Sequence, residues 1–156
     1  KYVPDDVTIN MVMSWIEDPG NKRGFILDGF PRTLSQAQAL DDRLSEIGGI
    51  DKVILFKVPE LELIKRLSGR ILCRKCQTPY HKEFSPPTND GTCDKCSGDL
   101  FQRDDDSEVV VKERLKVYRQ ETDPVVERYK EIGNILEIDG SLPIGVVEKS
   151  LRKALG

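Results

Sequence analysis

Four cysteines form two closely spaced pairs near the middle of the 156-residue chain. Cys73 and Cys76 make one C-x2-C pair, and Cys93 and Cys96 make another after sixteen intervening residues. Four thiolates from two tight turns suit a tetrahedral metal ion such as Zn²⁺, and ligation by four cysteines leaves no open position for a substrate. The spacing therefore predicts a structural zinc site. Two disulfides or a redox-active pair are the alternatives.

A second group of chemically active residues lies in the stretch GFILDGFPRT, residues 24–33. Asp28 could hold Mg²⁺ through water, Gly29 permits close backbone approach, and Arg32 can make forked, charge-assisted hydrogen bonds to an anion. Pro31 stiffens the exit from this turn. The alternative is an ordinary turn in which the acid caps the next helix and the arginine is solvated.

Four arginines flank the cysteine-containing segment. Arg66 and Arg70 lie four residues apart before it, so a helix would place them on one face. Arg103 ends the segment and Arg114 follows it. Single surface arginines contribute little, but two at each root of an insert could clamp a polyanion. Their joint placement therefore favours an anion site.

The pattern of apolar residues predicts the elements that position these groups. Short continuous apolar runs, typical of strands buried on both faces, occur at residues 25–27, 52–58 and 134–138. Helical spacing predicts helices at residues 5–16, 34–47, 61–67, 111–132 and 143–154. The first would start at a cap acid after Pro4, and the fourth would continue past Pro124 to a C-cap at Gly133. Such alternation predicts parallel βαβ units, with residues 71–103 as a small insert.

Composition narrows the class of protein. The chain is 38% hydrophobic and 33% charged, which is typical of a soluble globular protein. No apolar run approaches the length of a membrane span and no signal-peptide pattern opens the chain, so we expect a cytoplasmic protein that does not bind membranes. The formal net charge of −3 and the acids at residues 104–106 argue against a nucleic-acid partner.

These motifs together resemble one family. GFILDGFPRT with Gln36 after it, RLSGR before the cysteines, YHKEF among them and QRDDD with a later ER resemble adenylate kinases of the long-lid, zinc-containing bacterial type, over the whole chain. The resemblance implies transfer of the γ-phosphoryl group of MgATP to AMP, giving two ADP. It also implies an α/β fold with a P-loop nucleoside-monophosphate-kinase-like parallel sheet flanked by helices, a small β-rich lid insert held by zinc, and a monomer.

The same resemblance assigns domains and site residues. Residues 1–3 would belong to an AMP-binding domain, residues 4–69 and 108–156 to the core, and residues 70–107 to the lid. The implied AMP contacts are Lys1, Tyr2, Val3, Gly29, Phe30, Pro31, Arg32, Gln36, Arg103 and Arg114. The implied ATP contacts are Arg66, Arg70, Pro79, Tyr80 and Leu142. The implied catalytic residues are Arg32, Arg70, Arg103, Arg114 and Asp28, the last organising Mg²⁺ through water.

The sequence departs from the family in one respect. It contains no G-x-x-x-x-G-K-[ST] motif, the loop that normally cradles the phosphates of ATP. We therefore expect an N-terminally incomplete enzyme that is inactive by itself. Another nucleoside-monophosphate kinase or a GTP:AMP phosphotransferase is the nearest alternative, and a zinc-binding nucleic-acid module is a more distant one.

Overall fold

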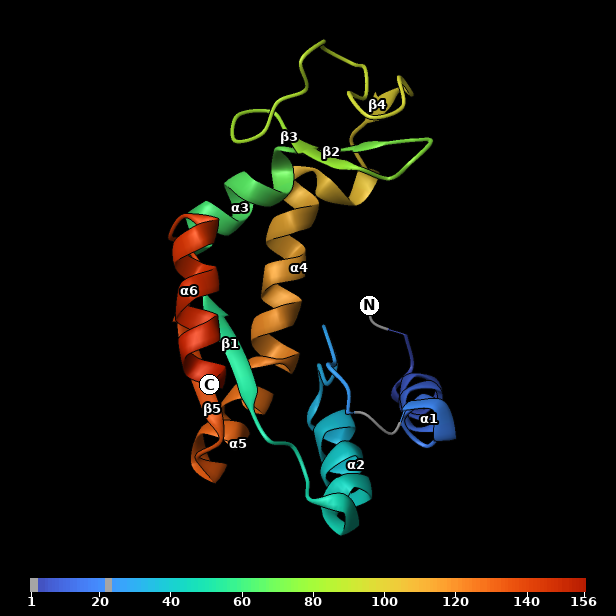
Figure 1. Ribbon diagram of the computed structural model, residues 1–156, viewed down its shortest axis with the longest axis vertical. Coiled ribbons are helices and arrows are strands. Elements are labelled where there is room, and N and C mark those ends of the chain that lie inside the picture. Colours follow the sequence, from blue (N-terminus) through green and yellow to red (C-terminus); the bar gives the residue numbers. More distant parts are fainter. Residues whose placement is uncertain (1–2, 22–23) are drawn as a thin grey trace. The chain divides into compact units, whose positions relative to one another are not determined.

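The computed structural model describes residues 3–21 and 24–156 (Figure 1). Lys1 and Tyr2, predicted to contact AMP, lie outside the described residues. The chain divides into two compact units. Unit 1 comprises Lys1–Phe56, Lys116–Asp139 and Pro143–Gly156, and unit 2 comprises Lys57–Leu115 and Gly140–Leu142. Over the part of the chain that is described, each helix is too short or too polar to cross a membrane.

In unit 1, the first predicted helix is confirmed as α1 (Asp5–Ile16) and the second as α2 (Leu34–Leu44), which continues into the short helix Ser45–Ile47. The predicted cap acid of α1 is wrong. The N-cap is Pro4, which makes no side-chain cap, and the carboxylate of Asp5 instead accepts hydrogen bonds from side chains of the 33–36 turn. Helix α2 has the side-chain N-cap that α1 lacks, because the Thr33 hydroxyl oxygen accepts a hydrogen bond from the Gln36 backbone N–H.

The α/β sheet of unit 1 pairs β1 (Val53–Lys57) with β5 (Ile135–Asp139), side by side in Figure 1. The Val53 N–H donates to Asn134, and four residues further along the Gly140 N–H donates to Lys57. From the first of these hydrogen bonds to the second, the residue numbers increase along both strands. The pairing is therefore parallel, as predicted. Helices α5 (Asp123–Ile132) and α6 (Ile144–Leu155) contact β5.

The predicted strand at residues 25–27 is wrong. Ile26 is 94% exposed, and in the described residues this sheet consists of β1 and β5 without a partner for the 25–27 run. A short apolar run becomes a strand only where a neighbouring strand satisfies its backbone groups. Phe25 instead packs edge-on against Trp15, with ring centroids 6.3 Å apart. Asp28 is therefore not presented at the end of a strand.

The predicted helix at residues 111–132 is two helices. Helix α4 (Glu108–Glu121) ends before Thr122, and α5 begins at Asp123. Pro124 is the cause, because it has no N–H to donate and is tolerated only in the first turn of a helix. The Gly133 C-cap is confirmed by its left-handed backbone, with φ of 84°.

A buried cluster holds the elements of unit 1 together. Ala37 of α2 packs against Val125 and Tyr129 of α5, each at most 4% exposed. The Asp41 carboxylate accepts from Arg128 at 2.8 Å and from the Tyr129 hydroxyl at 3.0 Å. Burial of the Tyr129 side chain is the main cause that raises its pKa, and the hydrogen bond to Asp41 raises the pKa further. Helix α2 is thus fixed to α5 by apolar and charged contacts.

Unit 2 contains α3 (Glu60–Ser68) and an antiparallel sheet in the order β3-β2-β4, with β2 at Arg70–Cys73, β3 at Pro79–His81 and β4 at Leu100–Phe101. The predicted small β-rich insert is confirmed. Arg70, however, does not lie on the helix of Arg66, because α3 ends at Ser68 and Arg70 begins β2. The intervening Gly69 is required by close packing, since a Cβ there would lie 2.3 Å from the His81 ring.

Candidate active site and metal centre

The four cysteines converge as predicted. Their sulfur atoms all lie within 4.8 Å of one another, with Cys73 to Cys96 at 3.4 Å and Cys76 to Cys93 at 3.6 Å. A tetrahedral site with metal–sulfur bonds of about 2.3 Å has sulfur–sulfur edges of about 3.8 Å. All four cysteines are free of disulfides. The thiols are therefore arranged to bind a metal ion.

Two similar turns bring the thiols together. Gln77 and Ser97 each follow the second cysteine of a pair and have left-handed backbones, with φ of 58° and 54°. The Gln77 N–H donates to the Cys73 carbonyl at 3.0 Å, and the Ser97 N–H donates to the Cys93 carbonyl at 2.9 Å. Each turn folds its pair back on itself, so that both sulfurs of the pair face the same point.

Neighbouring hydroxyl groups tune the thiols. The Thr78 hydroxyl lies 3.2 Å from Cys76, and its donation lowers the pKa of that thiol to about 6. The hydrogen bond with Cys76 raises the pKa of Cys96 to about 12, because one thiolate disfavours another beside it. A divalent cation would relieve this repulsion.

Tyr80 is part of this metal centre in the structure. Its side chain is 8% exposed, and its hydroxyl accepts from the Asp94 N–H at 2.8 Å. The hydroxyl proton is then available to Cys93, whose sulfur lies 3.4 Å away, and this contact lowers the pKa of Cys93. The side chain of Tyr80 is thus turned toward the thiols, whereas the preceding Pro79 is exposed.

His81 has a structural role, because both of its ring nitrogens make hydrogen bonds. Its Nδ1 accepts from the N–H groups of Glu83 at 3.0 Å and Phe84 at 3.1 Å, so Nε2 carries the proton. Nε2 lies 3.2 Å from the Lys65 carbonyl, to which it donates. The ring of His81 therefore joins β3 to the last turn of α3.

The candidate catalytic arginines of unit 2 gather around two aspartates. Asp106 is completely buried, and Arg70 donates to both of its oxygens, at 2.8 and 2.5 Å. Arg103 pairs with Asp105 at 2.7 Å. The Nη1 of Arg114 lies 3.6 Å from Asp106 and donates to the Asp105 carbonyl at 3.3 Å. The structure thus brings three of the four flanking arginines together.

Arg66 is held elsewhere in unit 2. It donates to the Gly140 carbonyl at 2.8 Å and to the Ser141 carbonyl at 3.3 Å, and pairs with Glu62 at 2.8 Å. Leu142, the predicted ATP contact that follows this loop, is 42% exposed. Two predicted ATP contacts are thereby placed beside each other. A hollow of about 430 Å³, near Arg103 rather than Arg66, is lined by Arg74, Phe101, Gln102, Arg103, Asp104 and Asp105.

The candidate AMP turn lies in unit 1. Asp28 is exposed, and Gly29 has a positive φ of 67°, where a Cβ would lie 2.7 Å from the Arg32 side chain. The Arg32 Nε donates to the Gly29 carbonyl at 2.6 Å, and the Arg32 carbonyl accepts from Thr122 at 2.9 Å. The turn is therefore compact, with its arginine folded over the glycine. Phe30 and Pro31 between them are half-buried and joined by a cis peptide bond.

Gln36 is 3% exposed, and both ends of its amide are bound within unit 1. Its oxygen accepts from the Arg32 N–H and its nitrogen donates to Asp5, each at 2.8 Å. The sequence predicts only a helix cap at the acid after Pro4, and does not predict that Asp5 binds Gln36, 31 residues away. The predicted contact Val3 is 60% exposed.

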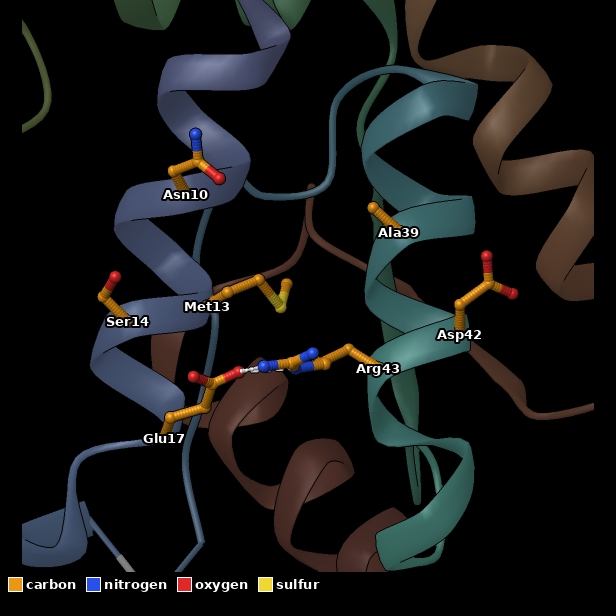
Figure 2. A pocket seen from close by; sticks show the side chains of 7 residues that line it. All are labelled: Asn10, Met13, Ser14, Glu17, Ala39, Asp42 and Arg43. Carbon is orange, nitrogen blue, oxygen red and sulfur yellow. Dashed lines mark hydrogen bonds and ion pairs between the residues drawn. The ribbon is translucent and has the colours of Figure 1, made fainter.

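A hollow of about 480 Å³ lies between α1 and α2 (Figure 2). Glu17 and Arg43 form an ion pair across it. It is lined by Asn10, Met13, Ser14, Glu17, Ala39, Asp42 and Arg43. None of the predicted site residues is among these, so this hollow is separate from the candidate AMP turn.

A family model and several curated relatives agree on one family. Residues 1–134 match the family model described as adenylate kinase. An adenylate kinase of Archaeoglobus fulgidus is 47% identical over 156 residues, covering 99% of this chain and 72% of that protein. One from Clostridium perfringens is 46% identical over 157 aligned positions, covering 100% and 73%. One from Carboxydothermus hydrogenoformans is 47% identical over 156 residues, covering 99% and 73%.

Proposed function

The chain belongs to the adenylate kinase family, and on that premise we propose that it serves the transfer of the γ-phosphoryl group of MgATP to AMP, giving two ADP. The observation that carries the proposal is the gathering of Arg70, Arg103 and Arg114 around Asp105 and Asp106. Phosphoryl transfer needs cations placed around the transferring oxygens more than it needs a covalent nucleophile.

In the proposed reaction, an oxygen of the AMP phosphate attacks the γ-phosphorus of ATP, and the bond from that phosphorus to the β–γ bridging oxygen breaks. Arg70, Arg103 and Arg114 neutralise the charge on the transferring oxygens. The carboxylates that hold these arginines in the described structure keep the guanidinium groups close together before the phosphates arrive. Arg66, Pro79, Tyr80 and Leu142 are the proposed contacts to the rest of ATP. Tyr80 would act through its backbone, because its side chain is buried.

On the AMP side, we assign the phosphate to Gly29–Arg32 and the base to Gln36. The Arg32 Nε donates to the Gly29 carbonyl in the described structure, and an anion would compete for the side chain. The exposed Asp28 would orient Mg²⁺ through water, and the ion would neutralise charge on the phosphates.

We assign a structural Zn²⁺ to the four cysteines, which would hold the two turns at residues 73–76 and 93–96 together. The residues fit this ion by donor type, number and sulfur–sulfur distance. Residues 70–107 would move as the lid domain, residues 1–3 would belong to the AMP-binding domain, and the core would comprise residues 4–69 and 108–156. The enzyme would act as a monomer on adenine nucleotides, without a nucleic-acid partner.

The test is nucleotide binding by calorimetry together with an assay for ADP formation. We expect AMP to bind, and Arg32→Ala to weaken AMP binding at least tenfold, since it removes a charge-assisted contact. Arg43→Ala is the matched control, because Arg43 pairs with Glu17 outside the AMP turn and its loss should leave AMP binding unchanged. Equal AMP binding by the wild type and Arg32→Ala would refute the assignment.

The same assay tests the donor and the activity of the chain itself. Since the sequence contains no G-x-x-x-x-G-K-[ST] motif, we expect this chain alone to bind nucleotide without measurable transfer. Binding constants for ATP, GTP, AMP and other nucleoside monophosphates therefore distinguish the nucleotide preference of an adenylate kinase from that of its nearest alternatives.

A further inference from the structure

The amide of Gln36 is held in one orientation. Its Nε2 donates to the Oδ1 of Asp5 at 2.8 Å, and its Oε1 accepts from the backbone N–H of Arg32 at 2.8 Å. A carboxylate can only accept and a backbone N–H can only donate. Turning the amide over would therefore face acceptor with acceptor and donor with donor, at a side chain that is only 3% exposed.

Asp5 is itself fixed by a second contact. Its Oδ2 accepts from the Thr33 hydroxyl at 2.7 Å, and the Thr33 oxygen accepts from the Gln36 N–H at 3.2 Å. These bonds form a closed ring between the first turn of α1 and the first turn of α2. The position of Asp5 is thus set independently of the amide that it binds.

We infer that Asp5 is a positioning residue that fixes the direction of the Gln36 amide and thereby makes the site select adenine over hypoxanthine. The inference rests on the proposed function, in which Gln36 meets the base of AMP. With these two contacts made, the amide keeps one N–H and one oxygen lone pair. Adenine offers an N6–H donor beside an N1 acceptor, whereas hypoxanthine offers an O6 acceptor beside an N1–H donor. An amide that cannot turn over fits only one of these orders.

Three variants test the inference, with dissociation constants for AMP and IMP measured by calorimetry. Asp5→Ala releases the amide nitrogen, and we expect about tenfold weaker AMP binding and a similar fall in the AMP-to-IMP preference. Asp5→Asn keeps an oxygen for Gln36 and can donate to Thr33, so it should retain the preference. Asp41→Ala is the matched control, because it removes a carboxylate with comparable contacts at the α2–α5 interface and should also retain the preference.

An unchanged AMP-to-IMP ratio in Asp5→Ala, or an equal loss in Asp5→Asn, would overturn the inference. Hydrogen exchange of the Gln36 side-chain amide, followed by NMR in the wild type without nucleotide, gives an answer even if Asp5→Ala does not fold. Slow exchange supports the fixed amide, and exchange as fast as that of an exposed glutamine contradicts it. If the wild type binds neither nucleotide, the proposed function fails, while the exchange measurement still decides whether the Gln36 amide is fixed in the free protein.

Discussion

Replacement of Arg70 by methionine should destabilise the protein far more than loss of an ordinary arginine. The carboxylate of Asp106 is completely buried, and Arg70 gives it two charge-assisted hydrogen bonds. In Arg70→Met, the nearest cation left to Asp106 is Arg114, at 3.6 Å. Breaking a buried ion pair by removing one partner costs about 3–5 kcal/mol, because the other charge stays buried.

The structure favours the lower end of this range. Arg114 still compensates part of the charge, and the Arg70 side chain is 30% exposed, so we expect a loss of about 3 kcal/mol of unfolding free energy. Since 1 kcal/mol shifts the Tm of a domain this size by about 2–4 °C, the Tm should fall by roughly 6–12 °C. The double variant with Asp106→Asn removes the stranded charge, and it should recover part of the loss.

The measurement is urea unfolding at neutral pH for the wild type, both single variants and the double variant, with calorimetry for the Tm. Arg152→Met is the control, because Arg152 makes an exposed ion pair with Glu148 and its loss should leave the Tm near that of the wild type. The reasoning fails if Arg70→Met is as stable as that control, or if the effects of the two single variants simply add in the double variant.

Two further substitutions have defined expectations. Tyr80→Phe should weaken zinc binding about tenfold, measured by chelator competition, because it removes an outer hydrogen bond to a metal ligand. Tyr129→Phe also loses a buried hydroxyl contact but should bind zinc normally, and equal weakening in both would contradict this role. Gly69→Ala should lower the Tm by several degrees, because its methyl group would lie 2.3 Å from the His81 ring. Gly145→Ala should leave the Tm unchanged, because a Cβ at that position has no atom within 4 Å. Equal Tm values for Gly69→Ala and Gly145→Ala would contradict the packing argument.

The cysteine centre could be predicted from sequence because its rules are local. Two residues between paired cysteines fix each turn, and the chemistry of four thiolates selects the ligand. Strands β1 and β5 were also predictable, since each is a short apolar run that finds a partner. Residues 25–27 are also a short apolar run. A strand, however, needs a neighbouring strand to pair with, and the run itself does not show whether one is present.

Other features depend on contacts between distant parts of the sequence. Asp5 bonds to Gln36 across 31 residues, and Thr122 bonds to the Arg32 carbonyl across 90. The pattern around Asp5 indicates only a helix cap, and Thr122 stands in no pattern that marks it. The separation of Arg66 from Arg70 has a local cause, because Gly69 ends α3 between them, and the break at Pro124 was likewise open to prediction.

The three residues of β3 connect the metal centre to the end of a helix. Successive side chains of a strand point to opposite faces, so Tyr80 reaches the thiols while His81 bonds to the Lys65 carbonyl in the last turn of α3. Binding of a metal to the folded state stabilises whatever is ordered with it, by an amount that grows with the free metal concentration. A zinc ion bound to the cysteines, as proposed, would therefore stabilise the α3 terminus as well as the cysteine turns.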